Sequence, residues 1–227
     1  MRIFLTILVA ILIGGGATYA WMYYGGFAGE KGTSVAFVEA YGNYNEIASR
    51  VEALTSLPST EGNTSRQELL SLLNSMLTET MDDAKREGLA RIAFTHVDTI
   101  KKEIDAAQAS QAKLYAVLQD FDNAARVFHG IELRTKAENI VALARKRAEL
   151  SARITSILAE TNDHTYAIVT RILGENGTLT QEHITAINDA TKAAEERHVT
   201  LETLSKELAQ KKDELDRAFS DFTKTAI

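Results

Sequence analysis

Residues 93–128 read AFTHVDTIKKEIDAAQASQAKLYAVLQDFDNAARVF, and this stretch decides the fold. Its apolar residues recur three and four positions apart, which is the spacing of one face of an α-helix. They form a heptad stripe that only Gln111 interrupts, as in helices that pack side by side. The stripe consists of Ala93, Val97, Ile100, Ile104, Ala107, Leu114, Leu118, Phe121, Ala125 and Phe128.

Two further stripes of the same kind follow. His129 and Gly130 predict a tight turn, and a helix is expected over residues 132–173. A glycine-containing turn ends it, and Thr178, with Gln181 three residues later, predicts the N-cap of a last helix. The second stripe is Leu133, Ala137, Ile140, Ala144, Ile154, Leu158, Ile168 and Ile172. The third is Ile184, Ile187, Ala194, Leu201, Leu208, Leu215, Phe219 and Phe222.

The residues before Gly88 predict an N-terminal helical hairpin over 34–87. Its first helix runs from Ser34 to Leu57, and Pro58 ends it. Thr64 or Ser65 caps the second helix, since Ser65 has Glu68 three residues on. The apolar spacing changes near Gly88, and we place a break there. In the alternative, the helix continues through Gly88 and the chain forms one four-helix bundle.

The fold class expected from these patterns is all-α. No sustained alternation of apolar and polar residues suggests strands, and the 227 residues include only one proline, which favours long helices. Matched helix lengths and short connections favour an elongated antiparallel bundle of three long helices over residues 88–227. The hairpin precedes this bundle in the sequence.

The N-terminal residues 1–28 predict a membrane anchor. Residues 3–13 are apolar except for Thr6, and no charged residue occurs between Arg2 and Glu30. An 18-residue helix from Ile3 would be about 27 Å long, close to the hydrocarbon thickness of a bilayer. Aromatic residues up to Tyr24 follow at the level of the interface, which Trp and Tyr prefer. We expect residues 3–24 to hold the protein at a membrane, and 29–33 to be a glycine-rich linker.

Two other interpretations of this segment remain open. It resembles a signal peptide that is cleaved near Ala20, which would make the body a secreted protein. It could also be a buried core helix. Under the anchor reading, Arg2 and the positive-inside rule put the N-terminus in the cytoplasm and the body on the extracytoplasmic side.

Charge and cysteine content exclude several classes of function. The net charge is −6, from 25 basic and 31 acidic residues, so we expect no binding to nucleic acid. There are no cysteines, which excludes disulfides, thiolate catalysis and zinc–thiolate sites. The basic triplet from Arg145 to Arg147 is interpreted as a solvated helix face.

Few residues suggest a site. Glu195 and His198 have the spacing of one carboxylate–histidine pair of a di-iron bundle, but no second such pair occurs, so His198 is read as a surface or partly buried histidine on the apolar stripe. His164 follows Asp163, and His183 follows Glu182. If their helices are antiparallel neighbours, these pairs could form a weak metal or pH-sensitive site. Two solvated histidines are the simpler interpretation.

Two N-glycosylation sequons occur, at Asn63 and Asn176, and both are expected in loops. Asparagine also favours turns, so both residues are interpreted as turn residues and glycosylation is left open.

No catalytic or nucleotide-binding motif occurs, so we expect neither an enzyme nor a cofactor. The predicted function is a non-catalytic structural or protein-interaction scaffold, acting through a protein partner or self-association along helical faces. The first alternative is a ligand-binding or sensory bundle that acts through a partner. The second is a membrane-inserting or remodelling protein.

Overall fold

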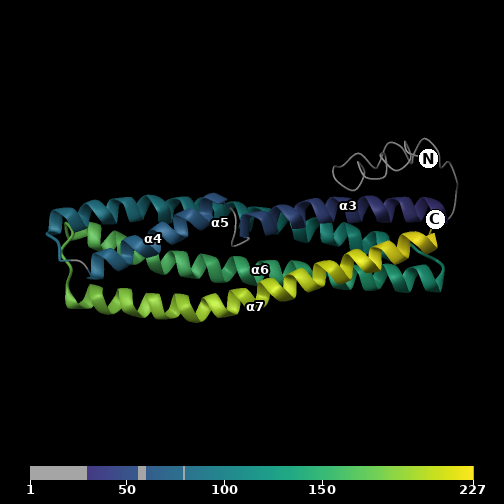
Figure 1. The fold of residues 1–227 in the computed structure, drawn as a ribbon. Helices are drawn as coiled ribbons and strands as arrows, with labels where there is room; N and C mark the ends of the chain where they lie inside the picture. Colours follow the sequence, from purple (N-terminus) through teal and green to yellow (C-terminus); the bar gives the residue numbers. More distant parts are fainter. Residues whose placement is uncertain (1–29, 56–59, 79, 227) are drawn as a thin grey trace, which may run out of the picture. The chain divides into compact units, whose positions relative to one another are not determined.

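The computed structural model of this chain describes the backbone of residues 30–55, 60–78 and 80–226, and the side chains of 32–55, 67–76 and 80–226. These residues form five α-helices and no strands: α3 (Glu30–Thr55), α4 (Thr60–Thr78), α5 (Asp83–Arg126), α6 (Ile131–Gly174) and α7 (Gln181–Ala226) (Figure 1). The prediction of an all-helical fold is therefore confirmed for the described part of the chain. Within it, no helix carries a stretch apolar and long enough to cross a bilayer. The predicted anchor 3–24 and the cleavage point near Ala20 lie outside the described residues.

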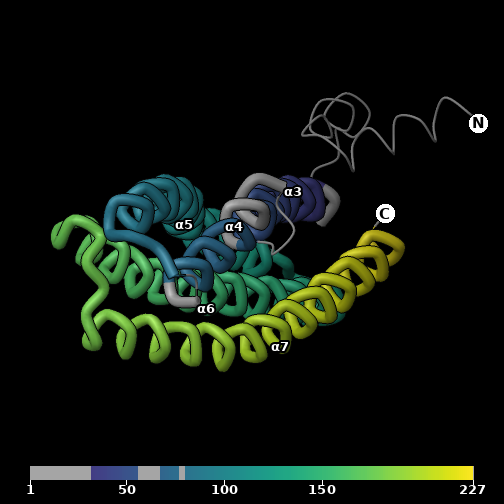
Figure 2. The backbone as a smooth tube through the Cα atoms, turned by 60° about the vertical axis from the view of Figure 1, so that its left-hand side comes forward, coloured from purple at the N-terminus to yellow at the C-terminus, as the bar shows by residue number. Residues whose placement is uncertain are grey.

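The helices, whose backbones Figure 2 traces, group into two compact units, and α3, α5, α6 and α7 each contribute to both. Unit 1 joins the described residues up to Arg50 with Ser110–Glu149 and the described residues from Leu208 onward. Unit 2 joins Val51–Ala109 with Leu150–Glu207. These units cut across the predicted division into 34–87 and 88–227.

Unit 1 has an aromatic core that three helices share. The ring of Phe37 on α3 lies 4.8 Å from Phe121 on α5 and 4.8 Å from Phe222 on α7, measured between ring centroids. Tyr41 stacks on Phe219 at 3.7 Å. Aromatic side chains bury more area than any aliphatic one, so this cluster is the main apolar contribution to unit 1.

Unit 2 has a core of mainly aliphatic side chains from the end of α3 and from α4, α5, α6 and α7. The described part of this core contains no buried aromatic residue, so each side chain buries less area than the rings of unit 1 do. Its buried apolar residues are Val51, Leu69, Met76, Ala90, Ala93, Val97, Ile100, Ile104, Ala107, Leu150, Ile154, Leu158, Val169, Ile172, Ile187, Leu201 and Leu204.

The described residues before the first long helix that are not helical are 80–82, so the helix does not begin at Gly88. Gly88 is in the second turn of α5, and a Cβ atom there would meet nothing within 4 Å. The helix starts earlier because the Asp82 carboxylate accepts a hydrogen bond from the Lys85 backbone N–H at 2.7 Å, which caps it. Asp83 in the first turn also complements the helix dipole.

Two other predicted boundaries differ from the structure. Residues 30–33, expected in the linker 29–33, belong to the first turn of α3, because a glycine in a helix costs only about 1 kcal/mol and packing can offset it. The predicted caps Thr64 and Ser65, and the predicted loop residue Asn63, all lie inside α4, which begins at Thr60.

Candidate functional site

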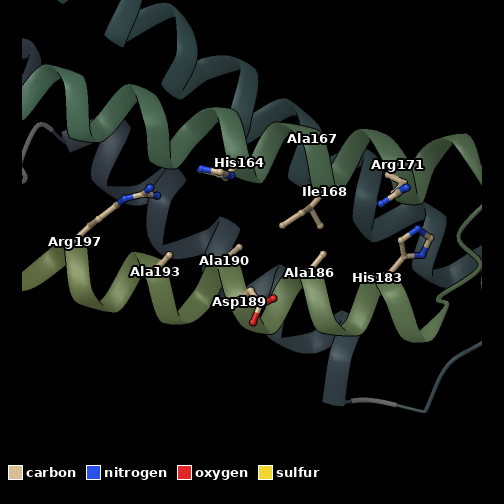
Figure 3. Close-up of a pocket in the computed structure, with 10 residues that line it drawn as sticks. All are labelled: His164, Ala167, Ile168, Arg171, His183, Ala186, Asp189, Ala190, Ala193 and Arg197. Atoms are coloured by element: carbon tan, nitrogen blue, oxygen red, sulfur yellow. The ribbon is translucent and has the colours of Figure 1, made fainter.

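A groove of about 470 Å³ lies between α6 and α7 within unit 2, and it is the candidate site (Figure 3). All but one of its lining residues are half-buried or exposed, so the groove is open to solvent. The side chains that line it are His164, Ala167, Ile168 and Arg171 from α6, and His183, Ala186, Asp189, Ala190, Ala193 and Arg197 from α7.

The groove exists because alanines occupy the facing positions of α7, opposite one alanine and three larger side chains of α6. On α7, the lining residues Ala186, Ala190 and Ala193 step by four and three, so they share one helical face. An alanine leaves empty the space that a leucine would fill. Between Ile187 and Leu201, every side chain of α7 is half-buried or exposed.

Two arginines line the edges of the groove, and each has an acidic partner. Arg171 forms an ion pair with Glu182 at 2.8 Å, and Arg197 lies 3.7 Å from Glu160. These acidic partners are outside the lining, where only Asp189 carries a negative charge. The groove therefore combines a small apolar floor with arginine–glutamate pairs along its edges.

His183 closes one end of the groove and caps α7. Its backbone N–H donates to Thr180 Oγ1 at 3.3 Å, and its ring Nδ1 accepts from the Thr180 backbone N–H at 3.2 Å. This is a reciprocal capping arrangement, with histidine at the position where glutamate is usual. Nδ1 also lies 3.2 Å from the Thr178 carbonyl oxygen, a contact that requires the opposite tautomer, and Nε2 lies 3.4 Å from Glu175 Oε1. The N-cap of α7 is therefore Thr180, whereas the sequence analysis predicted Thr178.

The turn before this cap ends α6 in a Schellman motif. The Gly177 N–H donates to Ile172 O at 3.0 Å and the Asn176 N–H to Leu173 O at 3.2 Å. Asn176 and Gly177 have φ of 52° and 82°, the left-handed conformation that this motif needs. Gly177 is packed against the first turn of α5, where a Cβ would collide with the Asp83 carbonyl oxygen and lie 2.8 Å from Glu87 N. Of the two sequon asparagines, Asn176 is thus in an exposed turn, as predicted.

The two predicted histidine pairs contribute one residue each to the groove. His164 lies near Arg197 and Ala190, while His183 lies near Arg171, with Ile168 between them (Figure 3). Asp163 is not in the lining. Among the described residues, no three His, Asp or Glu side chains come together as a metal site would require.

Glu195 and His198 do not form a pair. His198 is 61% exposed on its side chain, and its Nε2 lies 3.3 Å from Glu202. His198 is thus a surface histidine, which is one of the two interpretations that the sequence allowed, and its side chain is exposed although its spacing matches the apolar stripe.

No protein-family model, curated protein or solved structure matches this chain significantly. The chemistry of the described residues is therefore the basis for a function.

Sequence reasoning missed one buried polar centre, which lies in unit 1. Arg147, expected on a solvated face, is fully buried. Its Nη1 donates to Asn45 Oδ1 at 2.7 Å, and its guanidinium carbon lies 5.8 Å from the centre of the Tyr44 ring. The sequence did contain a sign of this burial, because positions 144, 147, 151 and 154 continue the heptad spacing. Residue 147 therefore lies on the inner face of α6.

Proposed function

We propose that this protein is a non-catalytic scaffold that binds a helix of a protein partner in the α6–α7 groove of unit 2. The observation that carries the proposal is the groove's floor of four alanines and Ile168, open to solvent between two long helices. Small residues allow another helix to approach closely, as ridge-into-groove packing requires.

The dimensions of the groove suit a helix of about four turns. Its lining on α7 runs from His183 to Arg197, which at 1.5 Å per residue is roughly 21 Å. The partner helix would place apolar residues of moderate size three and four positions apart on the floor. Acidic residues beside that stripe would face Arg171 and Arg197.

The same proposal places the protein at a membrane. Residues 3–24 anchor it, with the N-terminus in the cytoplasm and the helical body on the extracytoplasmic side. The support is the uncharged, largely apolar sequence from Ile3 to Gly29 after Arg2. A tethered bundle of this kind keeps its partner near the membrane.

The test is a pair of tryptophan variants of the full chain, recovered from detergent-solubilised membranes. Ala190→Trp fills the middle of the groove, and Ala106→Trp adds the same side chain at an exposed alanine of α5 in the same unit. A partner recovered with the wild type and with Ala106→Trp is expected to be lost with Ala190→Trp. Both variants should keep the helical circular dichroism of the wild type. Equal recovery with both would contradict the proposal.

A second candidate function is binding of a small ligand, with the signal passed to a partner. A volume of about 470 Å³ is within the range of ligand sites, and two arginines with His164 would suit an anionic amphiphile. Native mass spectrometry of the protein from membranes tests it. A bound small molecule that disappears in Ala190→Trp would favour this candidate over the scaffold.

A further inference from the structure

One end of unit 1 brings together the beginning of α3, the turn between α5 and α6, and the end of α7 (Figure 1). Phe128 in the turn lies 5.6 Å from Phe37 on α3 and 5.5 Å from Phe222 on α7, between ring centroids. Lys136 Nζ on α6 donates to Thr225 Oγ1 on α7 at 2.7 Å. These contacts fix which residues share this end.

The turn at this end presents two large apolar side chains to solvent. Val127 is 54% exposed and Ile131 is 85% exposed, while Phe128 between them is buried in the aromatic core. In the described part of unit 1, the only other exposed large hydrophobic residue is Tyr115. Isolated exposed apolar residues are common, but two in one turn mark a surface that something apolar covers.

We propose that this turn, residues 127–131, contacts the surface of a lipid bilayer. The inference rests on the proposed anchor at 3–24, because it depends on where that segment joins the unit. From residue 24 to Glu30 there are six Cα–Cα steps, which reach roughly 20 Å when fully extended. The end of unit 1 that bears Glu30 is therefore held close to the membrane interface, and the exposed turn is at that end.

The charges around the turn suit an interface of neutral lipid. Arg126 and Arg134 flank the two apolar residues, and the exposed Glu132 follows Ile131 directly. Each of these charges is paired within its own helix: Arg126 with Asp122 at 2.7 Å, Arg134 with Glu138 at 2.8 Å and Glu132 with Lys136 at 3.0 Å. Their charges are thus largely compensated, and apolar contact rather than attraction to anionic lipid drives the binding.

The absence of native cysteines allows a direct test with single-cysteine variants of the full chain. Ile131→Cys and Val127→Cys are labelled with an environment-sensitive fluorophore and reconstituted into phosphatidylcholine vesicles, with or without doxyl-labelled phosphatidylcholine. Tyr115→Cys is the matched control: an exposed hydrophobic position of the same unit, 12 residues or about 18 Å along α5 from Val127. Quenching by the doxyl lipid is expected to be at least twofold greater at 127 and 131 than at 115.

Carbonate extraction of the same vesicles separates the two proposals. If the protein stays in the pellet and the three probes are quenched equally, the turn does not contact lipid, although the anchor holds. If carbonate releases the protein, the anchor itself is wrong, and the lipid contact of the turn falls with it.

Discussion

The hydroxyl of Tyr41 on α3 donates a hydrogen bond of 2.9 Å to Asp216 Oδ1 on α7, joining residues 175 positions apart in the chain. Tyr41 is buried, whereas Asp216 is exposed at the edge of unit 1. Burial of the phenol, and then the nearby Asp216 carboxylate, raise the pKa of Tyr41 well above its ordinary value of 10.0. The contact thus ties the first described helix to the last and makes their pairing sensitive to alkaline pH.

Tyr41→Phe is expected to reduce the free energy of unfolding by about 1 kcal/mol at pH 8, because Asp216 loses its donor. The pH dependence has a definite sign. Above pH 10 the unfolded chain releases the Tyr41 proton while the folded chain keeps it, so stability falls as pH rises, by up to about 1.4 kcal/mol per pH unit. Urea unfolding at pH 8 and 11 should show a smaller loss in Tyr41→Phe than in the wild type. Tyr115→Phe, at an exposed position, should behave like the wild type, and the same pH slope in all three proteins would refute this assignment.

Gly177→Ala is expected to destabilise unit 2 by at least about 2 kcal/mol, because alanine resists a φ of 82° and its Cβ would strike the Asp83 carbonyl. Gly88→Ala is the control. It lies in the helix α5 with open space around it, so it should gain about 0.5–1 kcal/mol. Thermal unfolding followed by circular dichroism measures both. A stabilised Gly177→Ala, or a destabilised Gly88→Ala, would contradict the described turn or the described helix.

Arg147→Lys is expected to cost about 1–3 kcal/mol, although the charge is kept. The planar guanidinium both donates to Asn45 and lies against the Tyr44 ring, and an ammonium cannot do both. Arg145→Lys, two residues earlier at a side chain 54% exposed, should change stability by less than about 0.5 kcal/mol. Chemical denaturation compares them, and equal effects would mean that Arg147 is solvated after all.

Thr180→Ala is expected to lose about 1 kcal/mol, because Thr180 Oγ1 accepts the His183 N–H and caps α7. Thr178→Ala removes only an exposed hydrogen bond to Asp83 at 3.3 Å and should cost less than about 0.5 kcal/mol. Thermal melts of the two variants decide between the observed cap and the one predicted from sequence. A larger loss at Thr178 would favour the latter.

The heptad stripe of α5 was predictable because burial there follows spacing alone. All ten apolar residues expected on it, from Ala93 to Phe128, are buried. Even its interruption is accommodated: Gln111 is buried, and its Nε2 donates to Ala148 O at 3.1 Å. Periodicity reports which face is inward, and the neighbouring helix accepts one hydrogen bond from this amide, while its buried Oε1 has no hydrogen-bond partner.

Local competition between capping signals was harder to predict. Thr178 and Thr180 are both good caps, and the choice depends on His183, whose ring replaces the usual glutamate. At Gly88, the change of apolar spacing suggested a break, but the Asp82 carboxylate starts the helix earlier. Such choices depend on side-chain geometry that residue type does not reveal.

The groove and Arg147 show two ways in which the polarity of a residue fails to predict its burial. Alanines at 186, 190 and 193 have the spacing of a core, and sequence cannot distinguish a packed alanine from one that borders a groove. Arg147 has the charge of a surface residue, and only its register pointed inward. In both cases, the burial of the residue depends on which side chains of the neighbouring helix face it.

The aromatic cluster of unit 1 also sets an order for biosynthesis. Phe37 and Tyr41 pack against Phe222 and Phe219, so a nascent chain cannot complete this core until those two residues have left the ribosome. Every segment of unit 2 is made before then. Until that point Phe37 and Tyr41 can pack only on the α5 side of the core, against Phe121. A premature stop codon before residue 219 would thus leave the aromatic residues of α3 without half of their partners.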